Sequence, residues 1–495
     1  MTASECRPIE VPYVNPQAET TPPGLEPTFR DPAGQLQLTE NQALRRVRAA
    51  AAEEALRFLA SSLRKDLERS GELVPSEIIE PEAGVPVAPG ELWLRHPRID
   101  PISYPWEWTP AQWRVAAELT LRLAGKAIDA GWTLKDATPL NVLFQGAQPV
   151  FVDVLSFERR DPGSSVWLAY GQFVRTFLLP LFALKYLSWP LQATLFCRDG
   201  YEPTALFRAL PRWRRLSPDL LDVVTLAALF EGKGAGPEKP RSSTRDPELS
   251  ALILHKRLAR LGKQIRHAAE QNVKSQWSNY EQRASHYQPA DVERKQQFVR
   301  GVLEQVRPAR VLDVGANTGT YSLMAAQAGA EVVALDSDTA ALETLWRAAA
   351  GQRLPVAALV ANIARPTPAA GWRNREHLSL LDRLTGKFDL VLMLAVIHHL
   401  ILREQLPLDH IGGLCAQLTR RWLVLEWVPP SDPMFQGWLR GRDDLYGHLS
   451  EPDLTCAFAP FFEVRNRAEL GNGRILLLFE RHAAGEPPAG ADTKC

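Results

Sequence analysis

The second half of the chain alternates short apolar runs with stretches of helical periodicity. Five runs predict strands, at 310–314, 331–336, 355–361, 388–394 and 422–426. A further pair of runs, 461–465 and 474–481, is joined through Gly-Asn-Gly at 471–473, which is a hairpin signal. Helical periodicity at 291–306 and 319–329 separates the first strands from their neighbours. This order predicts an α/β domain with a doubly wound sheet and an antiparallel last strand.

The first half has a different, mixed pattern. Residues 41–69 carry apolar positions at helical spacing, whereas 72–105 hold short apolar pieces broken by prolines and read as small strands. Thr109 and Pro110 predict the start of a helix that runs to about Gly131. Two short strands follow within 141–153, and 166–230 reads as apolar helices. This half therefore predicts a separate α+β domain.

Composition shifts divide the chain further. The proline-rich start predicts a disordered leader over 1–40, followed by the α+β domain over 41–230. A glycine-, proline- and charge-rich segment at 231–248 predicts a linker, and 249–297 a helical lead-in. The doubly wound domain then occupies 298–481, and 482–495 reads as a flexible tail.

Charge and composition narrow the function classes and the compartment. The 495 residues include 57 basic and 57 acidic side chains, and this balance disfavours a nucleic-acid substrate. No apolar run is long enough to span a bilayer, and the N-terminus lacks the apolar core of a signal peptide. The five scattered cysteines suggest neither a zinc site nor a disulfide framework. We expect a cytoplasmic protein of undetermined oligomeric state.

The most informative stretch is the turn after the first strand of the second domain. Val311–Tyr321 reads V-L-D-V-G-A-N-T-G-T-Y, with glycines at Gly315 and Gly319. Asp336 ends the next apolar run, 21 positions after Gly315. A glycine turn followed by an acid at this distance is typical of a nucleoside site at the carboxyl edge of a parallel sheet. A dinucleotide fingerprint would require glycines where Asn317 and Thr320 stand.

The pattern D-x-G-x-N-x-G, from Asp313 to Gly319, resembles motif I of the class I S-adenosylmethionine-dependent methyltransferases. S-adenosylmethionine offers an ammonium, a carboxylate and a ribose diol in place of a phosphate. Asp313 suits the ammonium, the backbone N–H groups of the turn suit the carboxylate, and Asp336 suits the diol. The resemblance further implies cofactor contacts from four more residues: Ser337, Asn362, Ile363 and Leu394. Asn362 would read the adenine amino group where most relatives place Asp, and Ile363 would stack on the ring.

Candidate catalytic groups follow the fourth and fifth strands of this domain. His398 and His399 come directly after the run L-M-L-A-V-I, at the edge where the transferable methyl lies in this fold. Histidine titrates near working pH and could accept a proton from an incoming hydroxyl or amine. Packing beneath the cofactor or helix capping are the alternatives. Glu426 ends the fifth strand and could orient a histidine, bind a substrate hydroxyl or pair with an arginine such as Arg440.

A second motif lies in the first domain. Asp136 and Asn141 are spaced D-x-x-x-x-N, and Asp153 ends the second of two short strands. This stretch resembles the catalytic loop and metal-binding strand of kinase-like folds, so the domain is expected to be C-lobe-like. By resemblance, Asp136 would be the base, and Asn141 and Asp153 weak candidates for magnesium ligands. A kinase-like remnant without transfer activity, a specificity or docking module, and real phosphoryl transfer all remain open.

The motifs of both domains together resemble a bacterial family, the nodulation-protein-type (NoeA-like) S-adenosylmethionine-dependent methyltransferases. The stretches that carry this resemblance are Y-P-W-E-W, L-K-D-A-T-P-L-N-V-L-F and P-V-F-V-D-V-L-S-F-E in the first domain, with L-A-V-I-H-H-L and L-E-W-V-P-P-S-D-P-M in the second. The resemblance implies methyl transfer to an oxygen or nitrogen of a small molecule or saccharide-type acceptor. A bifunctional or kinase-like protein that binds ATP and magnesium, and a non-catalytic scaffold that binds S-adenosylmethionine, are the alternatives.

Overall fold

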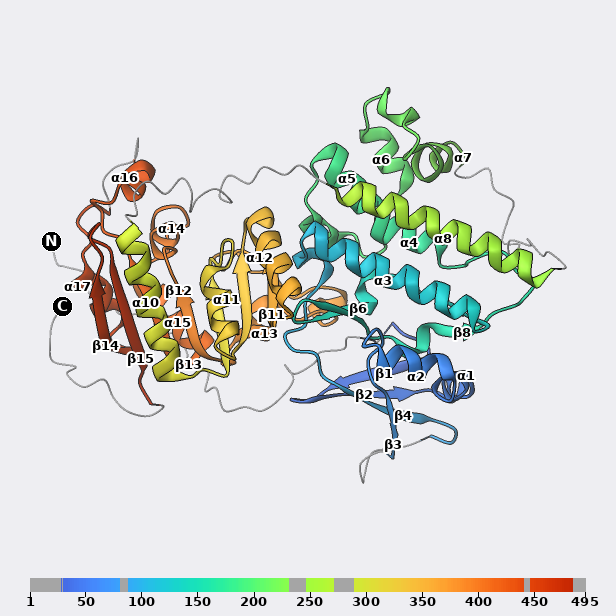
Figure 1. Cartoon of the computed structure of the whole chain (residues 1–495), viewed down its shortest axis with the longest axis horizontal. Coiled ribbons are helices and arrows are strands. Elements are labelled where there is room, and N and C mark those ends of the chain that lie inside the picture. Colours follow the sequence, from blue (N-terminus) through green and yellow to red (C-terminus); the bar gives the residue numbers. More distant parts are fainter. Residues whose placement is uncertain are drawn as a thin grey trace, which may run out of the picture.

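The computed structural model describes residue 28 and residues 30–80, 88–230, 246–270, 289–439 and 446–483. Two bodies lie side by side along the long axis of the molecule (Figure 1). One is built around a seven-stranded sheet and the other around a four-stranded sheet with a helical layer.

The seven-stranded sheet confirms the doubly wound methyltransferase-type fold predicted for the second half. Its order is β11 (Val356–Val360), β10 (Glu331–Asp336), β9 (Arg310–Val314), β12 (Phe388–Met393), β13 (Thr419–Trp427), β15 (Ile475–Arg481) and β14 (Phe462–Glu469). The five strands from β11 to β13 are parallel, and β15 runs antiparallel to both of its neighbours. The central strands β9 and β12 are buried on both faces, which explains why they read as continuous apolar runs.

Helices cover both faces of this sheet (Figure 1). They are α10 (Pro289–Val306), α11 (Thr320–Gln327), α12 (Thr339–Gln352), α13 (Leu380–Leu384), α14 (Ile397–Leu402), α15 (Leu408–Leu418), α16 (Pro433–Leu439) and α17 (Glu451–Phe458). Among the described cysteines, Cys197 and Cys415 are free thiols.

The four-stranded sheet of the first domain corrects two predictions. It is antiparallel, in the order β1 (Gly34–Leu38), β2 (Gln42–Val47), β4 (Leu92–Pro97) and β3 (Glu77–Ile79). Strand β1 lies inside the expected disordered leader, and β2 replaces the start of the helix expected over 41–69. That helix is α1 (Ala49–Leu59), followed by α2 (Ser62–Arg69). Backbone pairing of β2 with strands on both sides outweighs the helical spacing of its apolar residues.

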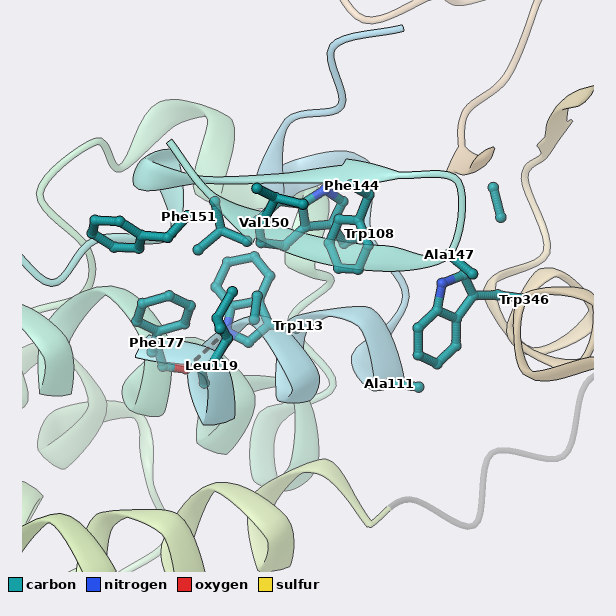
Figure 2. Close-up of a cluster of buried hydrophobic side chains, with 14 of the residues drawn as sticks. Trp108, Ala111, Trp113, Leu119, Phe144, Ala147, Val150, Phe151, Phe177 and Trp346 are labelled. Atoms are coloured by element: carbon teal, nitrogen blue, oxygen red, sulfur yellow. Dashed lines mark hydrogen bonds between the residues drawn. The ribbon is translucent and has the colours of Figure 1, made fainter. Parts of the chain in front are cut away.

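The rest of the first domain packs around the long helix α3 (Pro110–Asp129). Thr109 caps it by accepting from the Gln112 amide, as predicted. Two small antiparallel pairs follow, β5 (Trp132–Leu134) with β8 (Phe157–Arg159) and β6 (Val142–Gln145) with β7 (Gln148–Phe151). Figure 2 shows the β6–β7 hairpin over Trp108 and Trp113. Trp108 packs edge-on against Phe144, with ring centroids 5.1 Å apart.

A helical layer completes this domain. It comprises α4 (Tyr170–Phe173), α5 (Leu179–Leu187), α6 (Pro203–Ala209), α7 (Ala227–Phe230) and α8 (Pro247–Ala269), with short 3-10 and π-helical turns between them. Helix α8 packs against α3 and α5. The first part of the expected helical lead-in to the second domain therefore belongs to the packing of the first domain. Residues 231–245 of the expected linker lie outside the described residues.

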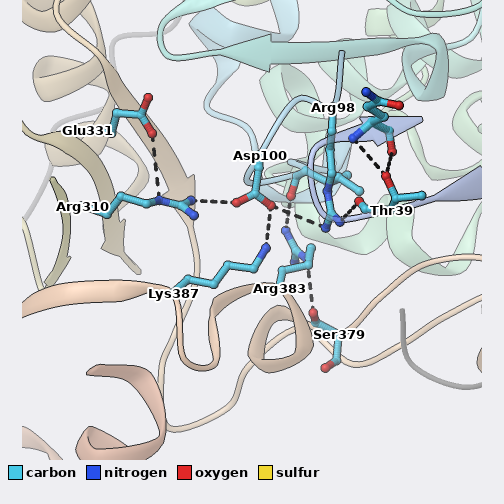
Figure 3. Close-up of polar contacts among 10 residues, drawn as sticks. Thr39, Arg98, Asp100, Arg310, Glu331, Ser379, Arg383 and Lys387 are labelled. Atoms are coloured by element: carbon cyan, nitrogen blue, oxygen red, sulfur yellow. Dashed lines mark hydrogen bonds and ion pairs between the residues drawn. The ribbon is translucent and has the colours of Figure 1, made fainter. Parts of the chain in front are cut away.

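Polar contacts tie the two domains together (Figure 3). Asp100 pairs with Lys387 at 2.6 Å and with Arg310 at 2.7 Å across the seam. Arg383 pairs with Glu107, and both side chains are almost completely buried. Breaking one partner of a buried pair costs about 3–5 kcal/mol, so this contact fixes how the domains meet.

Hydrophobic contacts reinforce the seam. Trp346 of α12 meets Phe144 of the β6–β7 hairpin edge-on, with ring centroids 6.4 Å apart (Figure 2). Gln112 donates to the Ala358 carbonyl on edge strand β11 at 3.1 Å.

Within the described ranges, no helix combines the length and the apolar character that crossing a membrane requires.

Candidate active site

The glycine turn after β9 adopts a conformation that only glycine accommodates at two positions. Gly315 and Gly319 have φ of +74° and +90°. A Cβ on Gly315 would lie 2.4 Å from Val396 Cγ2, and one on Gly319 would lie 2.1 Å from Leu345 Cδ1. Both glycines are therefore needed for backbone conformation and for close packing.

The turn forms one wall of a cavity of about 370 Å³ at the carboxyl edge of the sheet. Among its lining residues are eight of the predicted cofactor residues: Asp313, Gly315, Asn317, Asp336, Ser337, Asn362, Ile363 and Leu394. Gly319 does not line it and instead begins α11 as its N-cap residue. The structure thus brings together residues that are spread over 82 positions of the sequence, from 313 to 394.

Asp313 is a buried carboxyl group at the end of β9. It is 2% exposed and accepts a hydrogen bond from Ser322 Oγ at 2.6 Å. Burial raises the pKa of Asp313 to about 6, and the neighbouring charge of Asp336 contributes to the rise. A carboxylate held this way gains from a cation brought into the cavity, because the cation would lower its pKa again.

Asp336 and Asn362 stand at the ends of the two neighbouring strands. Asp336 Oδ2 accepts from the Asn317 amide and Oδ1 from the Asp338 amide, both at 2.8 Å. Burial raises the pKa of Asp336. Asn362 Oδ1 accepts from the Ala364 amide at 2.9 Å. These contacts fix both side chains at the rim of the cavity.

The two histidines occupy different positions. His399 lines the cavity, whereas His398 lies behind its wall and is 1% exposed. Their ring centroids are 4.1 Å apart. Burial lowers the pKa of His399 to about 4 and that of His398 well below its ordinary value. Both rings are therefore neutral at physiological pH, and His399 is the one that can reach a molecule in the cavity.

Glu426 lies beneath the cavity in a buried network of alternating charge. It is fully buried and pairs with Lys295 Nζ at 2.6 Å and with Arg474 Nη1 at 3.2 Å. Arg474 Nε pairs in turn with Asp432 at 2.8 Å. The arginine partner is thus Arg474; Arg440 lies outside the described residues. Of these four side chains only Lys295 lines the cavity, so Glu426 contacts the cavity wall through its ion pair with Lys295.

Sequence reasoning missed Lys295 and Arg474. Lys295 belongs to the buried stripe of α10, together with Asp291, Val299 and Val302. A lysine at a core-facing helix position is a sequence signal for a buried ion pair, because an unpaired buried ammonium is costly. Its ammonium also lies 5.0 Å from the centre of the Tyr321 ring, another cavity residue. The aromatic residues before α10, Trp277, Tyr280 and Tyr287, lie outside the described residues.

A second cavity, of about 440 Å³, lies in the first domain against residues 376–378 of the second. Asp136, Asn141 and Asp153 all line it, so the structure gathers the kinase-like motif at one place. Arg45 of β2 lies over the motif, and its Nη1 is 2.5 Å from Asp153 Oδ1. Asn141 Nδ2 donates to Ser156 Oγ at 3.2 Å.

The carboxyl groups of this second cavity are electrostatically unlike each other. Burial alone would raise the pKa of Asp153, but the Arg45 charge and hydrogen bonds from Ser156 and Arg45 lower it. Burial and the Asp153 charge raise the pKa of Asp136. Across the described residues, no three His, Cys, Asp or Glu side chains form a group that could hold a metal ion.

Comparisons with known proteins bear on the second domain and on the whole chain. Residues 312–417 match the family model described as "Methyltransferase domain". The chain is 29% identical over 465 residues to nodulation protein NoeA of Rhizobium meliloti strain 1021, covering 92% of this chain and 95% of that protein. These matches confirm the methyltransferase and NoeA-like resemblance, and S-adenosylmethionine is the cofactor of such domains. The kinase-like resemblance of the first domain stays a prediction.

Three solved structures resemble parts of the chain at low scores. Magnesium protoporphyrin IX methyltransferase of Synechocystis PCC 6803 with bound SAM is 17% identical, with 41% of this chain and 91% of that chain covered and a TM-score of 0.28. N-methyltransferase NodS of Bradyrhizobium japonicum WM9 is 14% identical, covers 39% and 97%, and scores 0.30. The bifunctional kinase-methyltransferase WbdD is 18% identical, covers 39% of each chain and scores 0.29. At these scores the likenesses carry no weight for the acceptor.

Proposed function

The chain carries an S-adenosylmethionine-dependent methyltransferase domain and is a relative of nodulation protein NoeA, and from this premise we propose that it methylates an oxygen or nitrogen of a small-molecule or saccharide-type acceptor. The observation that carries the proposal is the single cavity of about 370 Å³ that gathers Asp313, Asp336 and the glycine turn. The saccharide-type acceptor follows from the family resemblance alone.

The residues of the cavity fit the cofactor by their chemistry. Asp313, whose pKa burial raises to about 6, provides a carboxylate for the donor ammonium. Gly315 lines the cavity, and a Cβ there would clash with Val396, so glycine keeps the turn in the conformation that forms the cavity wall. Asp336 supplies acceptor oxygens for a ribose diol. When bound, S-adenosylmethionine supplies an activated methyl group on a sulfonium, which is already a good leaving group.

We further propose that His399 accepts the proton that the acceptor hydroxyl or amine releases. Its ring lines the cavity and is neutral at physiological pH, because burial holds its pKa at about 4. His398 supports the His399 ring from behind at a centroid distance of 4.1 Å. Glu426 contributes by fixing the Lys295 ammonium at the cavity wall, 2.6 Å from its own carboxylate.

Calorimetric titration with S-adenosylmethionine tests the cofactor half of the proposal. We expect binding by the unsubstituted chain and at least tenfold weaker binding by Asp336→Ala, which removes a charge-assisted hydrogen-bond acceptor. Asp409→Ala, an exposed acid at the start of α15, is the matched control and should bind as the unsubstituted chain does. An absence of binding, or equal binding by Asp336→Ala, would refute the proposal.

The first domain, in this proposal, contributes to acceptor binding. We do not extend the proposal to phosphoryl transfer, because Arg45 already neutralises Asp153 at the position expected to bind magnesium. A thermal-shift response to ATP that requires magnesium and is lost in Asp153→Ala would reverse this choice.

Incubation with methyl-labelled donor and pooled saccharide or amine acceptors distinguishes oxygen from nitrogen methylation. Turnover on any acceptor would remove the scaffold alternative.

A further inference from the structure

A short turn between α6 and α7 exposes two large apolar side chains side by side. Trp213 is 68% exposed and Leu216 is 73% exposed. Residues Arg214–Leu216 form a 3-10 helix, and Trp213 is its N-cap residue with helical backbone angles, φ −69° and ψ −29°. Residues three positions apart on a 3-10 helix point in the same direction, so the two side chains protrude together.

Arginines flank these two side chains in the sequence. We call residues 208–216 the Trp213 turn; four of its nine residues are arginines, at 208, 212, 214 and 215. Arg208 and Arg212 are exposed. The guanidinium of Arg214 lies over the Trp213 ring, 4.4 Å from its centre. Arg215 donates to the Leu210 carbonyl at 3.1 Å, which anchors the turn to the domain.

Three of the four acidic side chains nearest in sequence pair with arginines outside the turn. Asp199 pairs with Arg198, Glu202 with Arg175, and Asp222 with Arg260. Asp219 accepts a hydrogen bond from Tyr186, whose ring lies under the Arg214 guanidinium. Among the described residues, no ion pair joins an acid to Arg208 or Arg212. The Trp213 turn therefore presents an apolar tip beside two exposed arginines, Arg208 and Arg212, whose charge no described acid pairs with.

The turn also lies at the periphery of the molecule. In Figure 1, α6 and α7 stand out from the helical layer of the first domain at the top of the view, far from the seven-stranded sheet. A flat surface can thus approach the turn without meeting the second domain.

We propose that the Trp213 turn docks this protein on the surface of an anionic phospholipid membrane. Tryptophan partitions to the interface of a bilayer, and an adjacent leucine can insert beside it. Each arginine near an anionic surface contributes about 1 kcal/mol. A protein partner is disfavoured, because two protruding side chains fall far short of the ~800 Å² per partner of a stable interface. A membrane surface needs no matching shape and complements the positive charge.

Vesicle co-sedimentation of the full chain tests this proposal. We expect binding to vesicles of phosphatidylcholine mixed with phosphatidylglycerol and much weaker binding to phosphatidylcholine alone. The double variant Trp213→Ala with Leu216→Ala should lower the partition coefficient at least ~10-fold, because it removes the inserted apolar area. Arg212→Gln should lower it about 5-fold at low salt, and added salt should weaken the unsubstituted chain in the same direction.

A matched control is available in the second domain. Trp372 is 58% exposed and precedes Arg373, but Arg375 stands three positions on, where the Trp213 turn has Leu216. Trp372→Ala should therefore leave vesicle binding unchanged. Equal binding to neutral and anionic vesicles, or full binding by the double variant, would overturn the proposal. So would a dimer in ultracentrifugation that the double variant dissolves, because the turn would then contact a second copy.

Discussion

The two cavities of this protein are each lined by carboxylates near strand ends, yet one carboxylate of each cavity, Asp313 and Asp153, is held in the opposite electrostatic state from the other. In the second domain, burial raises the pKa of Asp313 to about 6, and its strongest partner is a serine hydroxyl. In the first domain, Asp153 is paired with Arg45 and its pKa is lowered. Asp313 can therefore pair with a cation that a ligand brings, whereas Asp153 is already paired with a cation of its own chain, Arg45. The same sequence pattern can therefore mark a binding site or a structural ion pair.

The largest expected effect concerns the proposed proton acceptor, His399, which lines the cavity of the second domain, called the donor cavity below. His399→Phe should lower kcat for methyl transfer about a hundredfold or more, because positioned general bases contribute 10²–10⁴ in rate. Because the pKa of His399 is about 4, the unsubstituted enzyme should keep its rate down to pH ~5 and lose it as pH falls through 4. A pH–rate profile in steady-state assays measures both. Asp136→Asn, in the cavity of the first domain, should change kcat less than twofold. A large loss of kcat there would show that the first-domain cavity also takes part in catalysis.

The next effect is on stability and falls on the first cavity. Asp153→Asn leaves the Arg45 guanidinium buried without its partner and should lower the free energy of unfolding by about 2–3 kcal/mol. Urea denaturation measures this loss. The double variant Arg45→Met with Asp153→Leu removes both charges and should recover much of the stability. A single variant as stable as the parent would show that the ion pair does not hold this cavity closed.

The equivalent change in the donor cavity should have the opposite pattern. Asp313→Asn keeps an acceptor for Ser322 but removes a carboxylate that burial disfavours, so stability should stay equal or rise by about 1 kcal/mol at pH 7.5. S-adenosylmethionine affinity should fall at least ~10-fold. Urea denaturation and calorimetry on the same preparation separate the two effects. A destabilised Asp313→Asn variant that binds S-adenosylmethionine normally would show that Asp313 stabilises the fold and does not bind the cofactor.

The smallest effect is the pH dependence of donor binding. The folded pKa of Asp313 lies above its unfolded value of 3.8, so its ionisation lowers the stability of the fold as pH rises from about 4 to about 6, with no further loss above that. The donor ammonium needs that ionised form. Affinity should therefore weaken a fewfold as pH falls from 7 to 5.5, and Asp313→Asn should show no such change. Calorimetry at a series of pH values measures this slope.

Much of the donor cavity could be predicted from the sequence because its determinants are local. Asp313, Gly315 and Asp336 sit at strand ends whose apolar runs are continuous, and parallel strands bring their carboxyl ends to one edge. The partners of Glu426 could not be predicted in this way. Lys295 lies 131 positions before it and Arg474 48 positions after it, on elements that only the folded sheet brings together.

The first domain was harder to predict for a related reason. Residues 42–47 carry helical spacing, but β1 and β4 pair with them on both sides, and no local signal announces that pairing. Arg45 lies on this strand, so its role at Asp153, 108 positions away, was equally hidden. The motif Asp136, Asn141 and Asp153 was visible, but the electrostatic state of its carboxylates was not.

The buried pair between Glu107 and Arg383 has a consequence for how this chain can be rearranged. Each half of the pair comes from a different domain, and neither side chain reaches water. If the methyltransferase domain were fused to a different N-terminal domain, the Arg383 guanidinium would be buried without a partner, unless the new domain placed an acid where Glu107 lies. The two residues are thus matched to each other, and a variant of this chain must keep both or replace both together.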